Sequence, residues 1–82
     1  MTRRTGDTRS ASWVASFPST HDAMLAEVLC AEARVPGRII PLPVQIDAGC
    51  GLAWKMPREA RESFEAAMAG RVAVAGYHLM EL

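Results

Sequence analysis

Hydrophobic and polar positions change their period several times along the chain, and each change predicts a new element. Residues 13–17 are aromatic and β-branched and stop at Pro18, which favours a strand. After it, apolar residues recur at three- and four-residue steps, which predicts a helix with its buried stripe at Met24, Leu25, Val28 and Leu29. Ser19 and Asp22 have the spacing of a capping box at its start. Val35-Pro36-Gly37 ends it.

The second half of the chain repeats this alternation. Residues 38–42 form a predicted strand, and Pro41 places it at a sheet edge because proline has no N–H to donate. Residues 52–56 alternate with period two, as a third strand does. Pro57 to Gly70 form a second predicted helix. Its buried stripe is Ala60, Phe64, Ala67 and Met68. On the solvent-exposed side, Arg61 is expected to pair with Glu65. Residues 72–74 and 77–82 form the fourth strand, with Gly76 as a bulge.

This order of elements predicts the fold class. Strand, helix, strand, strand, helix, strand is typical of an α+β, ferredoxin-like βαββαβ sandwich. We expect one four-stranded antiparallel sheet in the order 4-1-3-2 with two helices on one face. Residues 1–12 are polar and aperiodic, which predicts a disordered N-terminal tail before a single domain at 13–82.

Charge, apolar runs and the spacing of cysteine and histidine exclude several classes of function. Nine basic residues balance nine acidic ones, and this zero net charge argues against nucleic acid as the main partner. No apolar run approaches the roughly 18 residues of a membrane span, and no secretory signal is recognisable, so we expect a cytoplasmic protein without a membrane partner. The cysteine and histidine spacings match no zinc pattern, so we expect no metal and no cofactor.

Cys50 is the candidate functional group, because it lies between Gly49 and Gly51 in a predicted loop. The predicted topology brings this loop beside the first turn of the first helix, which is Ser19-Thr20-His21. The unpaired amides and partial positive charge of a helix start favour a thiolate, and His21 would add a proton or a positive charge. Asp22 and Asp47 act in the opposite sense.

Cys30 has a different prediction. It lies inside the first helix among apolar residues, where a free cysteine behaves as a small hydrophobe. We therefore assign it to the core, and we expect both cysteines to be thiols in a reducing cytosol.

Four short segments give the chain a resemblance to a known family. They are Phe17-Pro18-Ser19-Thr20-His21-Asp22-Ala23, Ile39-Ile40-Pro41-Leu42-Pro43, Gly49-Cys50-Gly51-Leu52-Ala53 and Tyr77-His78-Leu79-Met80-Glu81-Leu82. In these segments the chain resembles the selenium/sulfur carrier-like proteins, which are short bacterial and archaeal domains. The resemblance implies a carrier in which Cys50 holds sulfur or selenium as a persulfide-type adduct and passes it to a protein partner.

Three hypotheses follow for function. The first is this carrier, with protein donors and acceptors of sulfur or selenium, and not a free-standing enzyme. The second is a thiol redox sensor that forms a disulfide through Cys50. The third is a small interaction module in which the cysteine is incidental. A carrier needs no deep pocket, and we expect a chain of this size to lack a large one. Both sheet faces are partly apolar, so we also expect one face to pair either with another copy, as a homodimer through the open sheet face, or with a different partner.

Overall fold

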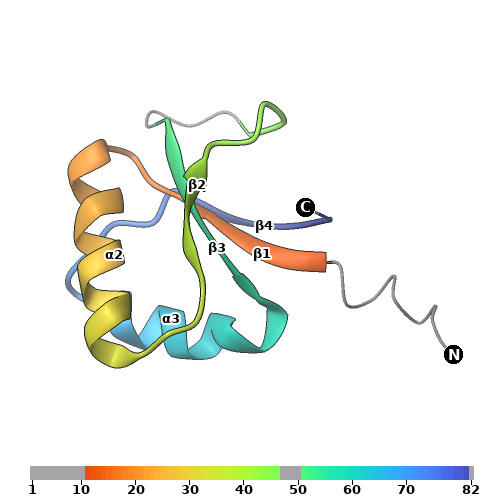
Figure 1. Cartoon of the computed structure of the whole chain (residues 1–82). Coiled ribbons are helices and arrows are strands. Elements are labelled where there is room, and N and C mark those ends of the chain that lie inside the picture. Colours follow the sequence, from red (N-terminus) through yellow and green to blue (C-terminus); the bar gives the residue numbers. More distant parts are fainter. Residues whose placement is uncertain (1–10, 47–50, 82) are drawn as a thin grey trace, which may run out of the picture.

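Four strands and two α-helices follow one another in the expected order. The computed structural model describes residues 11–46 and 51–81. The elements, shown in Figure 1, are β1 (Ala11–Ser16), α2 (Thr20–Ala33), β2 (Arg38–Pro41), β3 (Leu52–Pro57), the 3₁₀ helix η1 (Arg58–Ala60), α3 (Arg61–Met68) and β4 (Gly76–Glu81).

The sheet is antiparallel, with β1 in its interior. The strands lie in the order β2-β3-β1-β4, which read from the β4 edge is 4-1-3-2. β1 pairs with β3 on one side and with β4 on the other, and β3 also pairs with β2. The α+β class and the four antiparallel strands with two helices are therefore confirmed. β2 is an edge strand, as its Pro41 predicts.

Both helices pack on the same face of the sheet and share one core with it. This core contains Ala15, Trp54 and Met56 from the strands, Ala23, Ala26 and Cys30 from α2, and Phe64 and Met68 from α3. Phe64 lies at its centre, with ring centroids 6.5 Å from Phe17, 6.3 Å from Trp54 and 6.0 Å from Tyr77. The stripe predicted for the second helix is confirmed, because Ala60, Phe64 and Met68 are buried.

The stripe predicted for α2 was wrong at Met24 and Val28, whereas Leu29 packs against the core as expected. Met24 and Val28 are each 53% exposed, whereas Ala23, Ala26 and Cys30 are buried. The physical reason is the bulk of the aromatic core beneath the helix. Small side chains let the helix approach that core closely, so the larger apolar residues remain outside.

The connection from α2 to β2 depends on a glycine. Arg34 ends the helix in the left-handed conformation, and the chain then crosses the indole of Trp54 at Gly37, where φ is 141°. A Cβ on Gly37 would lie 2.8 Å from two indole atoms and closer still to the carbonyl oxygen of Lys55. The Gly37 position was predicted only as a helix stop, and its close approach to Trp54 is an additional constraint.

Two boundaries differ from the predictions. β1 begins at Ala11, two residues inside the predicted tail, because Ala11 and Ser12 pair with Glu81 and Met80. The remainder of the predicted tail, residues 1–10, lies outside the described residues. β4 begins only at Gly76, which is in regular register with Ser16 and forms no bulge.

The segment 72–74 is not a strand, although we predicted one there. The N–H groups of Arg71 and Val72 both donate to the carbonyl of Met68, which keeps this stretch attached to the end of α3. Val72 and Val74 pack against the core from this irregular path.

We predict that Gly37→Ala lowers the free energy of unfolding by about 2 kcal/mol or more, because the new methyl group meets the backbone and the Trp54 indole at an unfavourable φ. Chemical denaturation monitored by circular dichroism measures the change. Gly51→Ala is the matched control, since a Cβ there meets nothing within 4 Å, and we expect a change within about 0.5 kcal/mol. Equal stability of Gly37→Ala and the parent chain would contradict the assignment.

Candidate functional site

The elements on either side of the candidate cysteine meet at one end of the sheet, where β1 ends and β3 and β4 begin. We name it the Gly51 edge and define it by Ser16–Ser19, Leu42, Gly51–Leu52 and Ala75–Gly76. β1 ends here, and its last residue Ser16 is in register with both Ala53 and Gly76. The N–H of Ala75 donates to the carbonyl of Ser16 at 2.7 Å. Because β1 and β3 are antiparallel, the end of β1 and the start of β3 lie at the same edge.

Gly51 is fixed at this edge and is open to solvent. Its carbonyl accepts a hydrogen bond of 2.9 Å from the N–H of Leu42, which follows β2. A Cβ on Gly51 would touch nothing within 4 Å. Gly51 therefore leaves room beside the backbone.

Ile46 anchors the chain on the other side of the cysteine loop. Its N–H donates to the carbonyl of Pro43 at 3.0 Å, in a turn after β2. Its side chain is only 7% exposed and packs on Val14 and Ala53, on the sheet face that the helices leave open. The loop is therefore held at both of its described ends, at Ile46 and at Gly51.

The residues between these anchors lie outside the described residues, and they include Asp47, Gly49 and Cys50. The expected proximity of the Cys50 sulfur to the start of α2 thus stays a prediction. The described part brings Gly51 and Ser19 to the same edge of the sheet, which is the arrangement of the chain on which that prediction depends.

Ser19 is the N-cap of α2, as the capping box predicts. Its hydroxyl donates to a carboxylate oxygen of Asp22 at 2.8 Å and accepts from the Asp22 N–H at 3.2 Å. This cap satisfies one amide of the helix start and brings the negative charge of Asp22 to it. The net electrostatic effect of the helix start on a nearby thiol is therefore smaller than that of an uncapped terminus.

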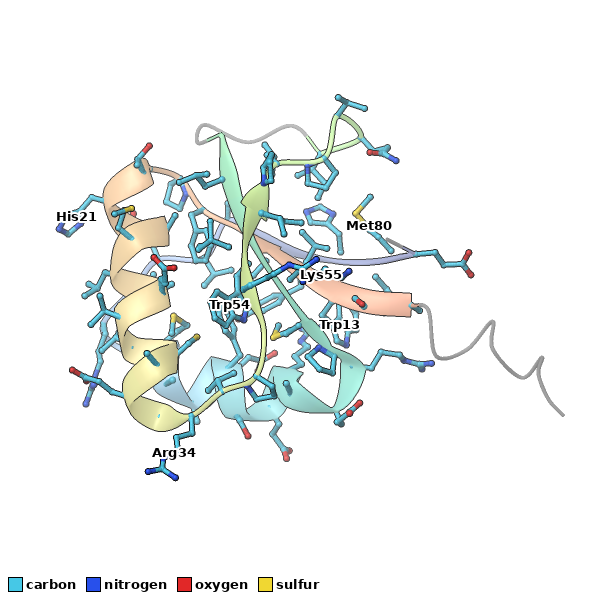
Figure 2. The ribbon with its side chains drawn as sticks, viewed as in Figure 1. Trp13, His21, Arg34, Trp54, Lys55 and Met80 are labelled. Atoms are coloured by element: carbon cyan, nitrogen blue, oxygen red, sulfur yellow. The ribbon has the colours of Figure 1, made fainter. Side chains whose placement is uncertain are left out.

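Thr20 and His21 form the exposed first turn of the helix. Figure 2 shows the imidazole of His21 on the outer side of α2, pointing away from the sheet. The described structure therefore does not direct this imidazole toward the first residues of β3, and sequence reasoning alone did not predict its orientation.

Cys30 is a core residue, as predicted. It is fully buried in the cluster beneath α2, and this burial raises the pKa of its thiol to about 11 from an ordinary value of 9.0. At neutral pH the group is a protonated thiol and not a nucleophile.

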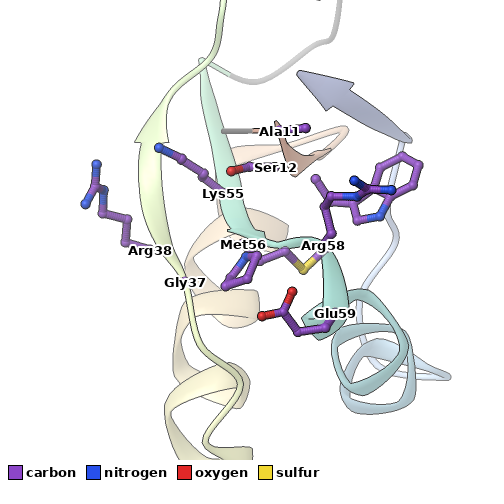
Figure 3. Close-up of a pocket in the computed structure, with 10 residues that line it drawn as sticks. Ala11, Ser12, Gly37, Arg38, Lys55, Met56, Arg58 and Glu59 are labelled. Carbon is purple, nitrogen blue, oxygen red and sulfur yellow. The ribbon is translucent and has the colours of Figure 1, made fainter. Parts of the chain in front are cut away.

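A large open groove lies at the opposite end of β3 from Gly51. Its volume is about 1030 Å³, and Figure 3 shows it between the start of β1, the start of β2 and η1. The expectation that so small a chain lacks a large pocket was therefore wrong. Arg38, Lys55 and Arg58 give its rim a positive character, with Glu59 opposing them.

Arg61 has a role that the sequence analysis missed. Its guanidinium pairs with Glu65, as expected, but it also lies 4.4 Å from the ring centroid of Trp13 and 4.2 Å from that of Tyr77. Such contacts between a cation and an aromatic ring are attractive. The available signal was strand alternation, which places Trp13 and Tyr77 on the helix-bearing face.

Residues 11–46 and 51–81 contain neither a candidate membrane span nor a cluster of metal ligands. Neither helix in these ranges has the length and apolar character needed to cross a bilayer. In the same ranges, no three side chains of His, Cys, Asp or Glu come together as a metal site would require.

Comparison with known protein families gives a match over most of the chain. A family model described as "Putative Se/S carrier protein-like" matches residues 12–78, which is most of the chain. No curated protein and no solved structure matches significantly.

We predict that the stability of the protein falls as the pH rises from about 9 to about 11. In this window the unfolded chain has lost the proton of Cys30 while the folded chain still holds it, and below it both states are protonated. Denaturation at a series of pH values measures the slope.

The comparison with Cys30→Ala isolates this effect. Burial also raises the pKa of Tyr77, so a fall of the same sign remains in every variant. We expect Cys30→Ala to lose the Cys30 part of the slope and Cys50→Ala to keep it. An identical alkaline slope in the parent chain and in Cys30→Ala would contradict the buried, protonated state of this thiol.

Proposed function

We propose, because the chain belongs to the Se/S carrier-like family, that it carries sulfur or selenium on Cys50 and relays it between protein partners. The observation that supports this most directly is the position of Gly51, the chain neighbour of Cys50. Gly51 is exposed, has open space beside it and is tied to the end of β2. An acceptor protein must reach the adduct, and an open sheet edge permits that approach.

The proposed reaction is an exchange between sulfur atoms. The Cys50 thiolate attacks the outer sulfur of a persulfide on a donor protein. A new S–S bond forms on Cys50, the S–S bond of the donor breaks, and the donor leaves as a thiolate. An acceptor thiolate then attacks the outer sulfur on Cys50 and regenerates the Cys50 thiolate. No external oxidant or reductant is consumed, because one S–S bond replaces another in each step.

The surroundings of Cys50 support this role to different degrees. For a Cys50 sulfur placed at the same edge, the remaining amides at the start of α2 would favour the thiolate and Asp22 would oppose it. Ser19 serves chiefly as the helix cap. The outward orientation of His21 in Figure 2 argues against direct assistance by that imidazole.

Protein partners would have an apolar surface beside this edge. Ile40, Leu42 and Met80 are partly exposed on the open sheet face around buried Val14 and Ala53. Burial of such side chains drives association between proteins. We assign this face to contact with the donor or the acceptor. The βαββαβ order and the strand neighbours support a ferredoxin-like arrangement. The proposed location is the cytoplasm, where reducing conditions would keep both cysteines as thiols.

The proposal is tested by incubating the reduced protein with glutathione persulfide, followed by mass spectrometry of its peptides. We expect Cys50 to gain one sulfur atom, and we expect an added acceptor thiol to remove it. Cys30→Ala should retain the full yield, because Cys30 is buried and protonated, whereas Cys50→Ala should lose it.

Other outcomes identify the competing functions. Accumulation of a mixed disulfide between Cys50 and glutathione, without transfer of the extra sulfur, would favour a thiol redox sensor. If neither adduct forms at Cys50 in the folded protein, the carrier proposal fails and an interaction module remains.

A further inference from the structure

Within residues 11–46 and 51–81, the outer edge of β4 has no strand beside it. Among the described residues, β4 pairs with β1 alone. Its sequence Gly-Tyr-His-Leu-Met-Glu contains no proline and no lysine, which are the residues that commonly block strand pairing at an edge. The opposite edge, β2, is shorter and carries Pro41. Every second residue of such an edge directs its N–H and C=O groups outward, where they can form hydrogen bonds with another strand.

The side chains of β4 on the helix-bearing face form a distinctive row. Tyr77 packs edge-on against Phe64, and strand alternation places Leu79 and Glu81 on the same face as Tyr77. Leu79 is 48% exposed, although its register partner Trp13 belongs to the core periphery. The guanidinium of Arg61 lies directly over Tyr77. The row therefore contains an exposed apolar side chain between a cation site and a carboxylate.

We propose that β4 pairs antiparallel with β4 of a second copy of the chain, around a two-fold axis at Leu79. This register sets Leu79 against Leu79 of the second copy and sets Tyr77 opposite Glu81 of the second copy. A register shifted toward His78 would set Leu79 against Tyr77, and one shifted toward Met80 would set it against Glu81. Neither shifted register gives Glu81 a cationic neighbour.

Charge complementarity selects the second copy as the occupant of this edge. In this register the carboxylate of Glu81 from the second copy lies opposite Tyr77 and next to Arg61, and the two-fold symmetry repeats this contact. Arg61 can bind this carboxylate and Glu65 together, because a guanidinium has five N–H donors. The existing ion pair also leaves room for it, since its two side chains are 35% and 47% exposed. Arg61 pairs with Glu65, and Glu81 takes no part in that ion pair.

The dimer leaves Gly51 and the start of α2 free in both copies. β4 begins at the Gly51 edge, where Gly76 is in register with Ser16. Antiparallel pairing therefore places the two Gly51 edges at opposite ends of an eight-stranded sheet. On the open face, His78 of each copy lies opposite Met80 of the other, so the open apolar surfaces become continuous. The inference does not depend on sulfur chemistry at Cys50.

Sedimentation equilibrium of the full chain tests the proposal with two variants of opposite charge. We expect the parent chain to dimerise with rising concentration, and we expect Leu79→Lys and Leu79→Glu each to raise the dimer dissociation constant by about tenfold or more. Because the axis passes through residue 79, an equimolar mixture of the two variants should form a heterodimer. Circular dichroism verifies that each variant is folded.

Val28→Lys and Val28→Glu are the matched controls, since Val28 is similarly exposed, at 53%, but lies on α2. We expect both to dimerise as the parent chain does. A parent chain that remains monomeric at its solubility limit would overturn the proposal, as would a mixture of the residue-79 variants that stays monomeric. Loss of the dimer in Leu42→Lys with retention in Leu79→Lys would instead place the interface on the open sheet face.

Discussion

The antiparallel pairing of β1 with β3 is the constraint on which the rest of the structure depends. It fixes the end of β1 beside the start of β3, with Ser16 in register with Ala53. The turn into α2 and the chain leaving the cysteine loop therefore meet at one edge. β4 begins at this edge as well, because Gly76 is also in register with Ser16. A slip of one residue in the β1–β3 register would exchange the faces of every side chain in β3.

The two faces of the sheet differ in how much of the core they hold. The helix-bearing face holds the aromatic core around Phe64, which joins α3 to β3 and β4. The open face has a smaller cluster, and Ile46 closes part of it from the turn after β2. That contact and the bond between Leu42 and Gly51 hold both described ends of the cysteine loop. The scaffold thus fixes the two points between which the loop runs.

The sequence was informative wherever a local rule acts alone. The alternation in β3, the Ser19 cap and the edge position of Pro41 each follow from the backbone chemistry of a few neighbouring residues. Sequence-based prediction failed where packing between distant segments determines which side chains are buried. The inner side of α2 carries small residues because the aromatic core is bulky, and no helical period reveals that. The stacking of Arg61 and the approach of Gly37 to the Trp54 indole both join segments distant in sequence.

The central claim is that the fold presents Cys50 at an accessible edge and encloses Cys30. Alkylation of the native chain with iodoacetamide near neutral pH, followed over time by peptide mass spectrometry, tests it most directly. The account predicts that Cys50 reacts in the folded protein at a rate close to that in the urea-unfolded chain, or faster. Cys30 should react only on unfolding, because it is fully buried. Protection of Cys50 to the same degree as Cys30 would contradict the account.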